Sequence, residues 1–469
     1  MREARSGLPA RAPAPTEAER AVQGLAGWVL ITAILAGGWS TTGRREHPSC
    51  GRKGPPVEVG RVLSIVAEPP RFPVRERTVS QLSLGVLSTS RKVDEHRLPL
   101  HPEHLERIPP DLRARILLER GYGEPFGVPD SVLERSVGGL ASRDDVIAQA
   151  GVLLLPKPQA ADLAQMRRGQ VLWGWPHCVQ DPEVTQIAID RDLTLIAFEA
   201  MHHWSADGGF GLHVFHKNNE MAGYCSVIHA LQVAGVTGDY GRRLRAVVIG
   251  FGATARGAVT ALNAHGIHDV DVLTHRGVAA VASPIHSAQM VHFAQDAAAP
   301  FLSHVLTAGG EVPLAPFLAE HDLVVNCTLQ DTAHPQVYLG GPDLDAFRPG
   351  SLIIDVSCDE GMGFSWARPT TFRDPVVQVG DHIGYYAVDH SPSYLWGSAT
   401  WEISEALLPF LRTVMDGPAG WDASQTVRRA IEIRGGHVVN PAVLAFQRRQ
   451  DAHPHARVPR PTVPEGSAA

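Results

Sequence analysis

The chain has 469 residues, which is too long for a single hydrophobic core and suits two or three domains. Apolar residues make up 44% and charged residues 19% of it, and its net charge of −7 argues against a nucleic-acid-binding surface. The five cysteines are scattered without C-x-x-C spacing, which indicates reduced thiols rather than a disulfide framework or a metal site.

Residues 1–81 are predicted to form a poorly ordered N-terminal extension. Within it, residues 25–39 are an apolar run that follows several arginines. This order is typical of a leader peptide, but the run is shorter than the roughly 20 residues of a membrane span. We expect a cytoplasmic protein, and a leader or membrane anchor at residues 25–39 is the alternative.

Short apolar strands alternate with helices from about residue 82 to residue 216. Lys157 directly follows the predicted strand 152–155, between two prolines that hold its loop rigid. His177 follows the predicted strand 171–175. Both side chains therefore lie at the carboxyl ends of strands, which is where ligands bind in α/β sheets.

A glycine turn organises the next part of the chain. After a long helix predicted over 218–234, the apolar strand 246–249 leads into Gly250-Phe251-Gly252 and then a helix. Such glycines let the backbone approach a pyrophosphate at the helix N-terminus, and Ala255 fills the third position of this dinucleotide-binding pattern. A purely structural glycine turn is the alternative.

The end of the following strand, predicted over 268–273, indicates which dinucleotide binds. A ribose-binding carboxylate would stand at this end, but Asp271 lies too early in the strand. Arg276 follows Thr274 at the strand end and suits a 2′-phosphate, so NADPH is favoured over NADH. The alternative for Arg276 is a solvated surface charge. The Ala- and His-rich insertion at 277–310 is given no function.

Further strands, predicted over 323–327 and 352–356, continue this nucleotide domain through residue 384. Asn326 and Thr274 are candidate cofactor contacts at strand ends. A helix is predicted from about 398 to 414, and the proline-rich polar end, residues 451–469, is expected to be disordered.

Several motifs resemble those of the alanine dehydrogenase/pyridine nucleotide transhydrogenase family, over about residues 82–411. They are Pro-Lys-Pro at 156–158, Trp-Gly-Trp-Pro-His at 173–177, Asn-Glu-Met-Ala-Gly at 219–223 and Asp-Val-Ser-Cys-Asp at 355–359. Within the family, the stretches 325–327, 354–359, 368–371 and 388–393 resemble the N5-(carboxyethyl)ornithine synthase branch.

The resemblance implies an α/β fold of two doubly wound parallel-sheet domains that face each other across a cleft. One is a Rossmann-type nucleotide domain, at 217–384. The other is a Rossmann-like substrate domain, built from 82–216 and completed by 385–450. It also implies an assembly of identical subunits.

Matching positions imply roles for four side chains. Arg97 would grip the carboxylate of a 2-oxo acid, and Lys157 would polarise its keto group. His177 would be a general acid/base that titrates near neutrality, and Asp359 would handle protons around the intermediate. The alternatives are a solvated arginine, a structural histidine and an aspartate that caps a helix.

The chain departs from alanine dehydrogenases at residues 389–393, where Asp-His-Ser-Pro-Ser replaces Asn-Met-Pro-Gly. Asp389 adds a negative charge that suits a cationic diamino acid, and His390 is a further candidate contact. The function implied is NADPH-dependent condensation of pyruvate with the side-chain amine of ornithine or lysine. The alternatives are an NAD-dependent alanine dehydrogenase and a non-catalytic NADP-binding protein.

Overall fold

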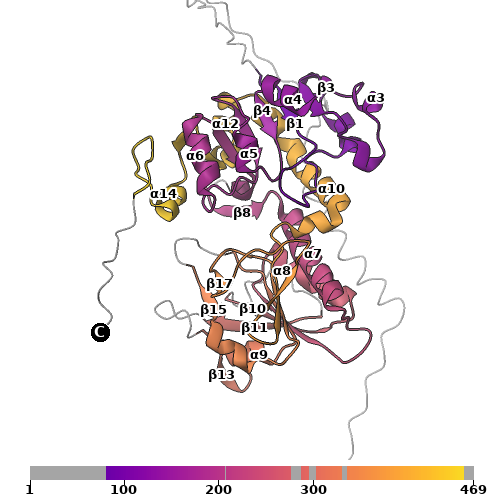
Figure 1. Ribbon diagram of the computed structural model, residues 1–469, viewed down its shortest axis with the longest axis vertical. Helices are drawn as coiled ribbons and strands as arrows, with labels where there is room; N and C mark the ends of the chain where they lie inside the picture. Colours follow the sequence, from indigo (N-terminus) through magenta and orange to yellow (C-terminus); the bar gives the residue numbers. More distant parts are fainter. Residues whose placement is uncertain (1–80, 206, 276–286, 295–302, 330–334, 459–469) are drawn as a thin grey trace, which may run out of the picture. The chain divides into compact units, whose positions relative to one another are not determined.

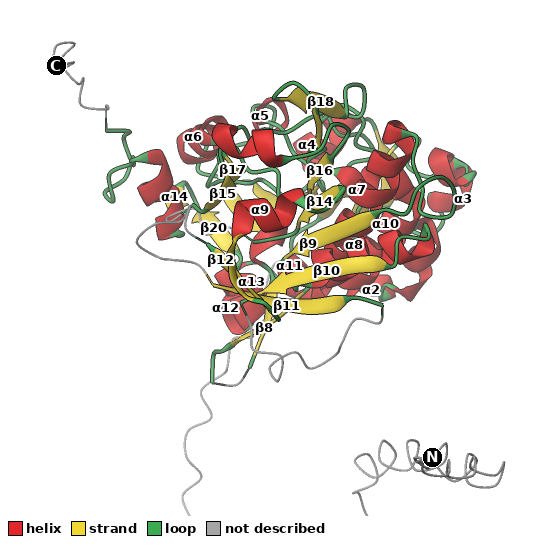
Figure 2. Ribbon diagram, turned by 90° about the horizontal axis from the view of Figure 1, so that it is seen from below, coloured by secondary structure: helices red, strands yellow, loops and turns green. Residues whose placement is uncertain are grey.

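The computed structural model describes residues 81–205, 207–275, 287–294, 303–329 and 335–458. In this part of the chain the strands form two large sheets and two two-stranded ribbons, and helices pack on both faces of each large sheet (Figures 1 and 2). The expected α/β class, with two doubly wound domains, is therefore confirmed.

The substrate-domain sheet has six parallel strands, from β6 to β3, and two antiparallel strands that come from the C-terminal part of the chain. Residues 431–438 thus complete a sheet that begins at residue 84. In spatial order the strands are β21 (His437–Val438), β20 (Ile431–Arg434), β6 (Thr194–Ala197), β5 (Val171–Gly174), β4 (Val152–Leu154), β1 (Leu84–Val86), β2 (Ile116–Glu119) and β3 (Gly139–Ala141).

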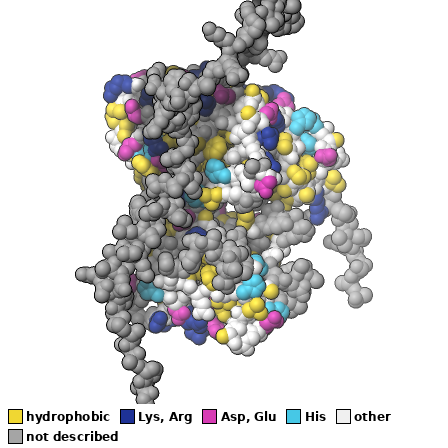
Figure 3. Space-filling view, turned by 180° about the vertical axis from the view of Figure 1, so that it is seen from behind, with side chains coloured by type: hydrophobic (Ala, Val, Ile, Leu, Met, Phe, Trp, Pro, Cys, Tyr) yellow, Lys and Arg dark blue, Asp and Glu magenta, His cyan; other side chains and the backbone are white. Residues whose placement is uncertain are grey.

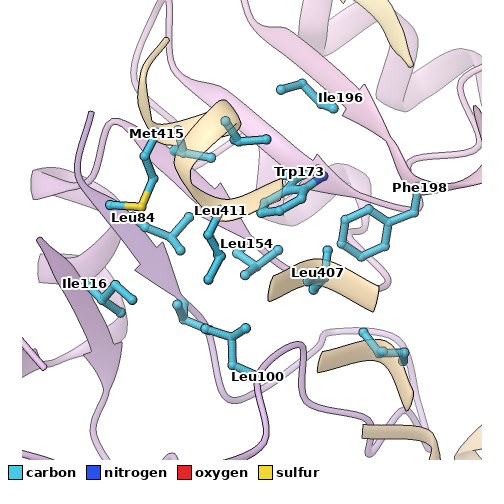
Figure 4. Packing of buried hydrophobic residues seen from close by; sticks show 14 of the residues in the cluster. Leu84, Leu100, Ile116, Leu154, Trp173, Ile196, Phe198, Leu407, Leu411 and Met415 are labelled. Carbon is cyan, nitrogen blue, oxygen red and sulfur yellow. The ribbon is translucent and has the colours of Figure 1, made fainter. Parts of the chain in front are cut away.

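Successive residues of a strand point to opposite faces, so the apolar central strands bury both faces of this sheet. Leu154, Trp173 and Ile196 pack against Leu407 and Leu411 on one face (Figure 4). That face is covered by α10 (Trp396–Leu407), α11 (Leu411–Met415), α12 (Pro418–Ala423) and α13 (Gln425–Arg429). The other face is covered by α4 (Arg143–Gln149), α5 (Ala160–Leu163), α6 (Pro182–Asp190) and α14 (Pro441–Gln447).

Shorter elements connect these layers. They are η1 (Pro102–Arg107), α2 (Pro110–Arg113), η2 (Glu124–Phe126), α3 (Asp130–Leu133), η3 (Phe198–Ala200), the hairpin of β7 (His202–Trp204) and β8 (Phe210–His213), η7 (Ser391–Leu395) and η8 (Leu408–Phe410).

The nucleotide-domain sheet has nine strands, with β9, β10, β11, β14, β16 and β19 parallel and β12, β13 and β18 antiparallel at its edges. In spatial order they are β13 (Gly310–Pro313), β12 (His304–Thr307), β11 (Gln289–Ala294), β10 (Asp269–Thr274), β9 (Arg245–Ile249), β14 (Leu323–Asn326), β16 (Leu352–Asp355), β19 (Ile383–Tyr386) and β18 (Val376–Val379).

Two helices cover one face of this sheet, α7 (His216–Ala234) and α8 (Ala253–Ala264), and α9 (Leu314–Ala319) and η6 (Gly341–Ala346) cover the other. A small ribbon of β15 (Val337–Leu339) and β17 (Gly363–Phe364) lies beside α9. The described residues of the insertion contribute β11 and β12 to the sheet.

Two of the expected boundaries need correction. The boundary at 384 falls inside β19, which pairs with β16 along its length and so belongs wholly to the nucleotide sheet. The disordered tail does not begin at 451, because His455 is buried and its Nε2 accepts a hydrogen bond from the Val438 N–H, at 3.1 Å.

The apolar run at 25–39 lies outside the described residues. Among the described helices, none is long and apolar enough to span a membrane. On the face in Figure 3, basic and acidic side chains of the described residues are interspersed.

Candidate active site

The candidate catalytic side chains follow the carboxyl ends of four adjacent parallel strands. Lys92, Glu95 and Arg97 follow β1, Lys157 follows β4, and His177 follows β5. Glu199 follows β6 in the short helix η3. Parallel strands end at one edge of the sheet, so these residues gather there.

Lys157 and His177 are in direct contact, because the Lys157 Nζ lies 2.9 Å from the His177 Nε2. His177 has a left-handed backbone conformation (φ +47°), which is uncommon for a residue other than glycine. Its backbone N–H donates a hydrogen bond to the Glu199 Oε1, at 2.8 Å. The sheet edge therefore brings the predicted lysine and histidine together in a constrained turn.

The surroundings of this pair disfavour a positive charge on the His177 ring beside the lysine ammonium. Burial, and then the Lys157 charge, hold the pKa of His177 well below its usual value of 6.5. Burial also lowers the pKa of Lys157, although the Asp389 carboxylate opposes that effect. This direction runs against the expectation that His177 titrates near neutrality, and a neutral ring can accept a hydrogen bond from the lysine ammonium.

Arg97 is held in a buried ion pair. Its Nε donates to the Glu95 Oε1 at 2.8 Å and its Nη2 to the Glu95 Oε2, and its Nη1 donates to the Asn218 Oδ1 at 3.2 Å. The guanidinium also lies 5.2 Å from the centre of the Trp175 ring. Burial alone would raise the pKa of Glu95, but Arg97 lowers it to about 2. Glu95 therefore neutralises the charge of Arg97.

Asp389, which follows β19, joins the two domains. It accepts hydrogen bonds from the Lys92 Nζ at 2.8 Å and from the His390 Nδ1 at 2.7 Å. Despite its burial, the hydrogen bond from His390 and the charges of Lys157 and Lys92 lower the pKa of Asp389. A second link comes from Ser393, whose Oγ donates to the Glu95 Oε1 at 2.6 Å.

Asp359 and Asn326 lie at the carboxyl edge of the nucleotide sheet. Burial raises the pKa of Asp359, and the charge of Lys157 opposes this shift, so the two side chains interact electrostatically. Asn326 is fully buried: its amide donates to the Asp355 Oδ1 at 2.9 Å and its Oδ1 accepts from the Thr328 hydroxyl. Its side chain thus braces the strand ends.

The glycine turn has the shape of a dinucleotide site. Gly250 has φ +107°, and a Cβ there would lie 3.0 Å from the Cys327 carbonyl oxygen. A Cβ at Gly252 would meet nothing within 4 Å, and no side chain caps the N-terminus of α8. This open cradle with uncapped N–H groups fits a pyrophosphate. Ala255 is buried in the helix, Thr274 is buried at the end of β10, and Arg276 lies outside the described residues.

Three residues of the site were missed from the sequence: Lys92, Glu95 and Glu199. Glu95 stands two positions before Arg97, and Glu199 follows the apolar run 193–198, so their positions along the chain could have signalled both. Lys92 carries no such signal, because its partner Asp389 is 297 residues away.

Comparison with known proteins gives matches to both halves of the chain. The N-terminal domain model of the alanine dehydrogenase/PNT family matches residues 85–222, and the C-terminal domain model matches residues 227–441. An alanine dehydrogenase of Mycobacterium tuberculosis is 25% identical over 357 residues, which cover 72% of this chain and 88% of that protein. An N(5)-(carboxyethyl)ornithine synthase of Clostridium botulinum is 23% identical over 344 residues, which cover 69% and 92%.

Solved structures agree on the fold. An L-alanine dehydrogenase aligns with a TM-score of 0.61 at 18% identity, covering 78% of this chain and 98% of its own. A transhydrogenase from Sinorhizobium meliloti aligns with a TM-score of 0.56 at 21% identity, covering 76% and 99%. Relatives of two kinds match at similar identity, so the similarity supports the shared family and leaves the two branches equal.

Proposed function

Since the chain belongs to the alanine dehydrogenase/PNT family, we propose that it condenses pyruvate reductively with the side-chain amine of ornithine or lysine, using NADPH. Membership of this family establishes that the protein is an NAD(P)-dependent oxidoreductase that acts on amino groups of amino acids. The proposal concerns the amine, the oxo acid and the choice of nicotinamide nucleotide.

The observation that carries the proposal is the position of Asp389. Its carboxylate already holds the ammonium of a lysine side chain, Lys92, at 2.8 Å, and it interacts electrostatically with Lys157. A terminal ammonium on a flexible aliphatic chain therefore fits this position, and a free diamino acid would present the same group. Substrate binding would require Lys92 to give up its place.

The side chains at the sheet edge suit the proton steps of such a reaction. The amine must lose a proton to add to the keto carbon, and the resulting hydroxyl must gain one to leave as water. A neutral His177 can accept the first proton, and the Lys157 ammonium can donate to the keto oxygen. A bound reduced nicotinamide supplies the hydride that converts the imine to a secondary amine.

The deciding experiment follows NADPH oxidation by absorbance, with pyruvate and either L-ornithine, L-lysine or ammonium. NADH is run beside NADPH, and products are identified by mass spectrometry. An N-(1-carboxyethyl) amino acid formed with NADPH is the expected result. Turnover with ammonium and NADH alone would overturn the proposal.

A second candidate is an alanine dehydrogenase that uses ammonia. The Lys92–Asp389 pair favours it, because Asp389 is already neutralised and needs no cationic substrate. The variant Asp389→Asn separates the two. It should raise KM for a diamino acid by about 10- to 100-fold, since a charge-assisted hydrogen bond contributes about 1.5–3 kcal/mol. An ammonia-using enzyme should keep its KM for ammonium within about threefold, because that contribution is absent.

A further inference from the structure

Glu199 is a partly buried carboxyl group to which neither the sequence nor the proposed reaction gives a role. Its Oε1 accepts the His177 backbone N–H at 2.8 Å and lies 3.9 Å from the His177 Nδ1. Its Oε2 is buried and has no hydrogen-bond partner among the described atoms. Leaving a buried polar atom without a hydrogen-bond partner costs folding free energy, so its presence calls for an explanation.

The contact on the other side of the His177 ring indicates which ring nitrogen carries the proton. A lysine ammonium has three donors and no acceptor, so the Nε2 that faces the Lys157 Nζ must be unprotonated. The proton of the neutral ring is therefore on Nδ1, the nitrogen that faces Glu199.

We infer that Glu199 is a positioning residue, which holds the His177 ring with Nδ1 protonated and so keeps Nε2 as the atom that accepts protons. One carboxyl oxygen accepts the backbone N–H of His177 and lies 3.9 Å from the Nδ1 of its ring. This inference deepens the proposed function, because the proton acceptor that it orients is the one used there. The same division of labour between an acid/base and its orienting group occurs in many enzymes.

The charges around Glu199 favour its neutral form. Glu432 on β20 is the like charge that affects Glu199 most, Lys157 is the opposing cation, and the His213 Nε2 lies 3.2 Å from the Glu199 backbone oxygen. Burial, followed by Glu432, raises the pKa of Glu199 to about 8. A glutamine would therefore imitate its state at pH 7 closely, and an alanine would not.

The test compares Glu199→Gln and Glu199→Ala in the full chain. At pH 7 the glutamine variant should keep kcat within about threefold, and it should lose the inflection near pH 8 that comes from Glu199. The alanine variant should lose about 10- to 100-fold in kcat with KM for the oxo acid little changed, as is usual when an orienting partner is removed. Glu432→Gln is the comparison: it removes a like charge that acts on Glu199, so it should keep kcat at pH 7 and move the inflection near pH 8 to lower pH.

A second readout does not depend on any reaction. In protein labelled with ¹⁵N-histidine, the signals of His177 are assigned by their loss in His177→Asn. They should show the Nδ1–H form in the wild type and in Glu199→Gln, and a mixture in Glu199→Ala. An unchanged Nδ1–H form in Glu199→Ala would overturn the inference, even with the proposed substrates turned over. The absence of turnover with those substrates would overturn only the proposed function.

Discussion

Lys157 and His177 form the unit on which proton transfer depends, and neither side chain has its ordinary properties. The lysine donates to the ring at 2.9 Å, while burial penalises a charge on either group. Burial, and then the neighbouring ammonium, keep the His177 ring neutral, so it can accept a proton at physiological pH.

Replacing Lys157 should raise the pKa of His177. In Lys157→Met the charge that lowers the pKa of His177 is gone, so this pKa should rise, while burial keeps it below 6.5. An NMR titration of the His177 ring measures the shift.

The acid limb of kcat/KM in the wild type should likewise lie below pH 6.5, because the ring must be neutral to act as a base. Asp359→Asn is a useful comparison, because Asp359 interacts with Lys157 while the main shifts in the pKa of His177 come from burial and from Lys157. A lower pKa in Lys157→Met would contradict this account.

For Arg97, the role of the side chain could be predicted from the sequence, but its tertiary partners could not. The resemblance to the family predicted that Arg97 binds a carboxylate, and the structure places Arg97 after β1, at the sheet edge that also carries Lys157 and His177. Whether the guanidinium is free depends on Glu95, Asn218 and Trp175, and the latter two come from distant segments. A single sequence does not report such tertiary pairing.

At the scale of elements, the contact between α7 and α8 places the glycine turn. A Cβ at Gly257 would lie 1.7 Å from the Glu220 carbonyl oxygen, and a Cβ at Gly223 would lie 1.9 Å from the Thr254 carbonyl oxygen. The two backbones thus approach as closely as glycine permits. Because Gly257 lies one turn after the N-terminus of α8, this contact fixes the helix end that the pyrophosphate is expected to meet.

Two glycine substitutions should separate packing from binding. Gly257→Ala should lower the free energy of unfolding by about 3 kcal/mol or more, because the helices must move apart. Gly252→Ala should leave this free energy within about 0.5 kcal/mol, since open space surrounds its Cβ, but it should weaken NADPH binding. Denaturant unfolding and NADPH fluorescence titration measure the two effects. Equal stability of both variants would show that the helix contact is not what holds the turn.

The strands at the centre of each sheet were predictable, because short apolar runs with β-branched residues are typical of buried parallel strands. The ends of the nucleotide domain were not. The predicted boundary at residue 384 divides β19, which is held by its pairing with β16, a contact across about 30 residues that local patterns do not encode.

At the scale of the molecule, the substrate domain is one sheet made from two separate parts of the chain. Leu407, Leu411, Met415 and Trp421 cover a face that strands β1, β4, β5 and β6 cannot bury by themselves. A chain that ends at residue 395 should therefore lack a folded substrate domain, which circular dichroism and limited proteolysis would detect. A chain that ends at residue 458 keeps every element described above and is the control. A protease-resistant substrate domain in the shorter chain would contradict this dependence.

The same discontinuity has a consequence for synthesis on the ribosome. Residues 84–204 emerge first with one apolar face of their sheet uncovered, and the nucleotide domain follows in a single uninterrupted stretch. Domains generally fold as units as they emerge, so the half that was made second should reach its native state first. About 190 further residues must be synthesised before the helices α10 to α13 can cover the early strands. During this interval the exposed apolar face of the nascent chain is a binding surface for chaperones. The chemistry at Lys157 and His177 is thus assembled only when the last helices have left the exit tunnel.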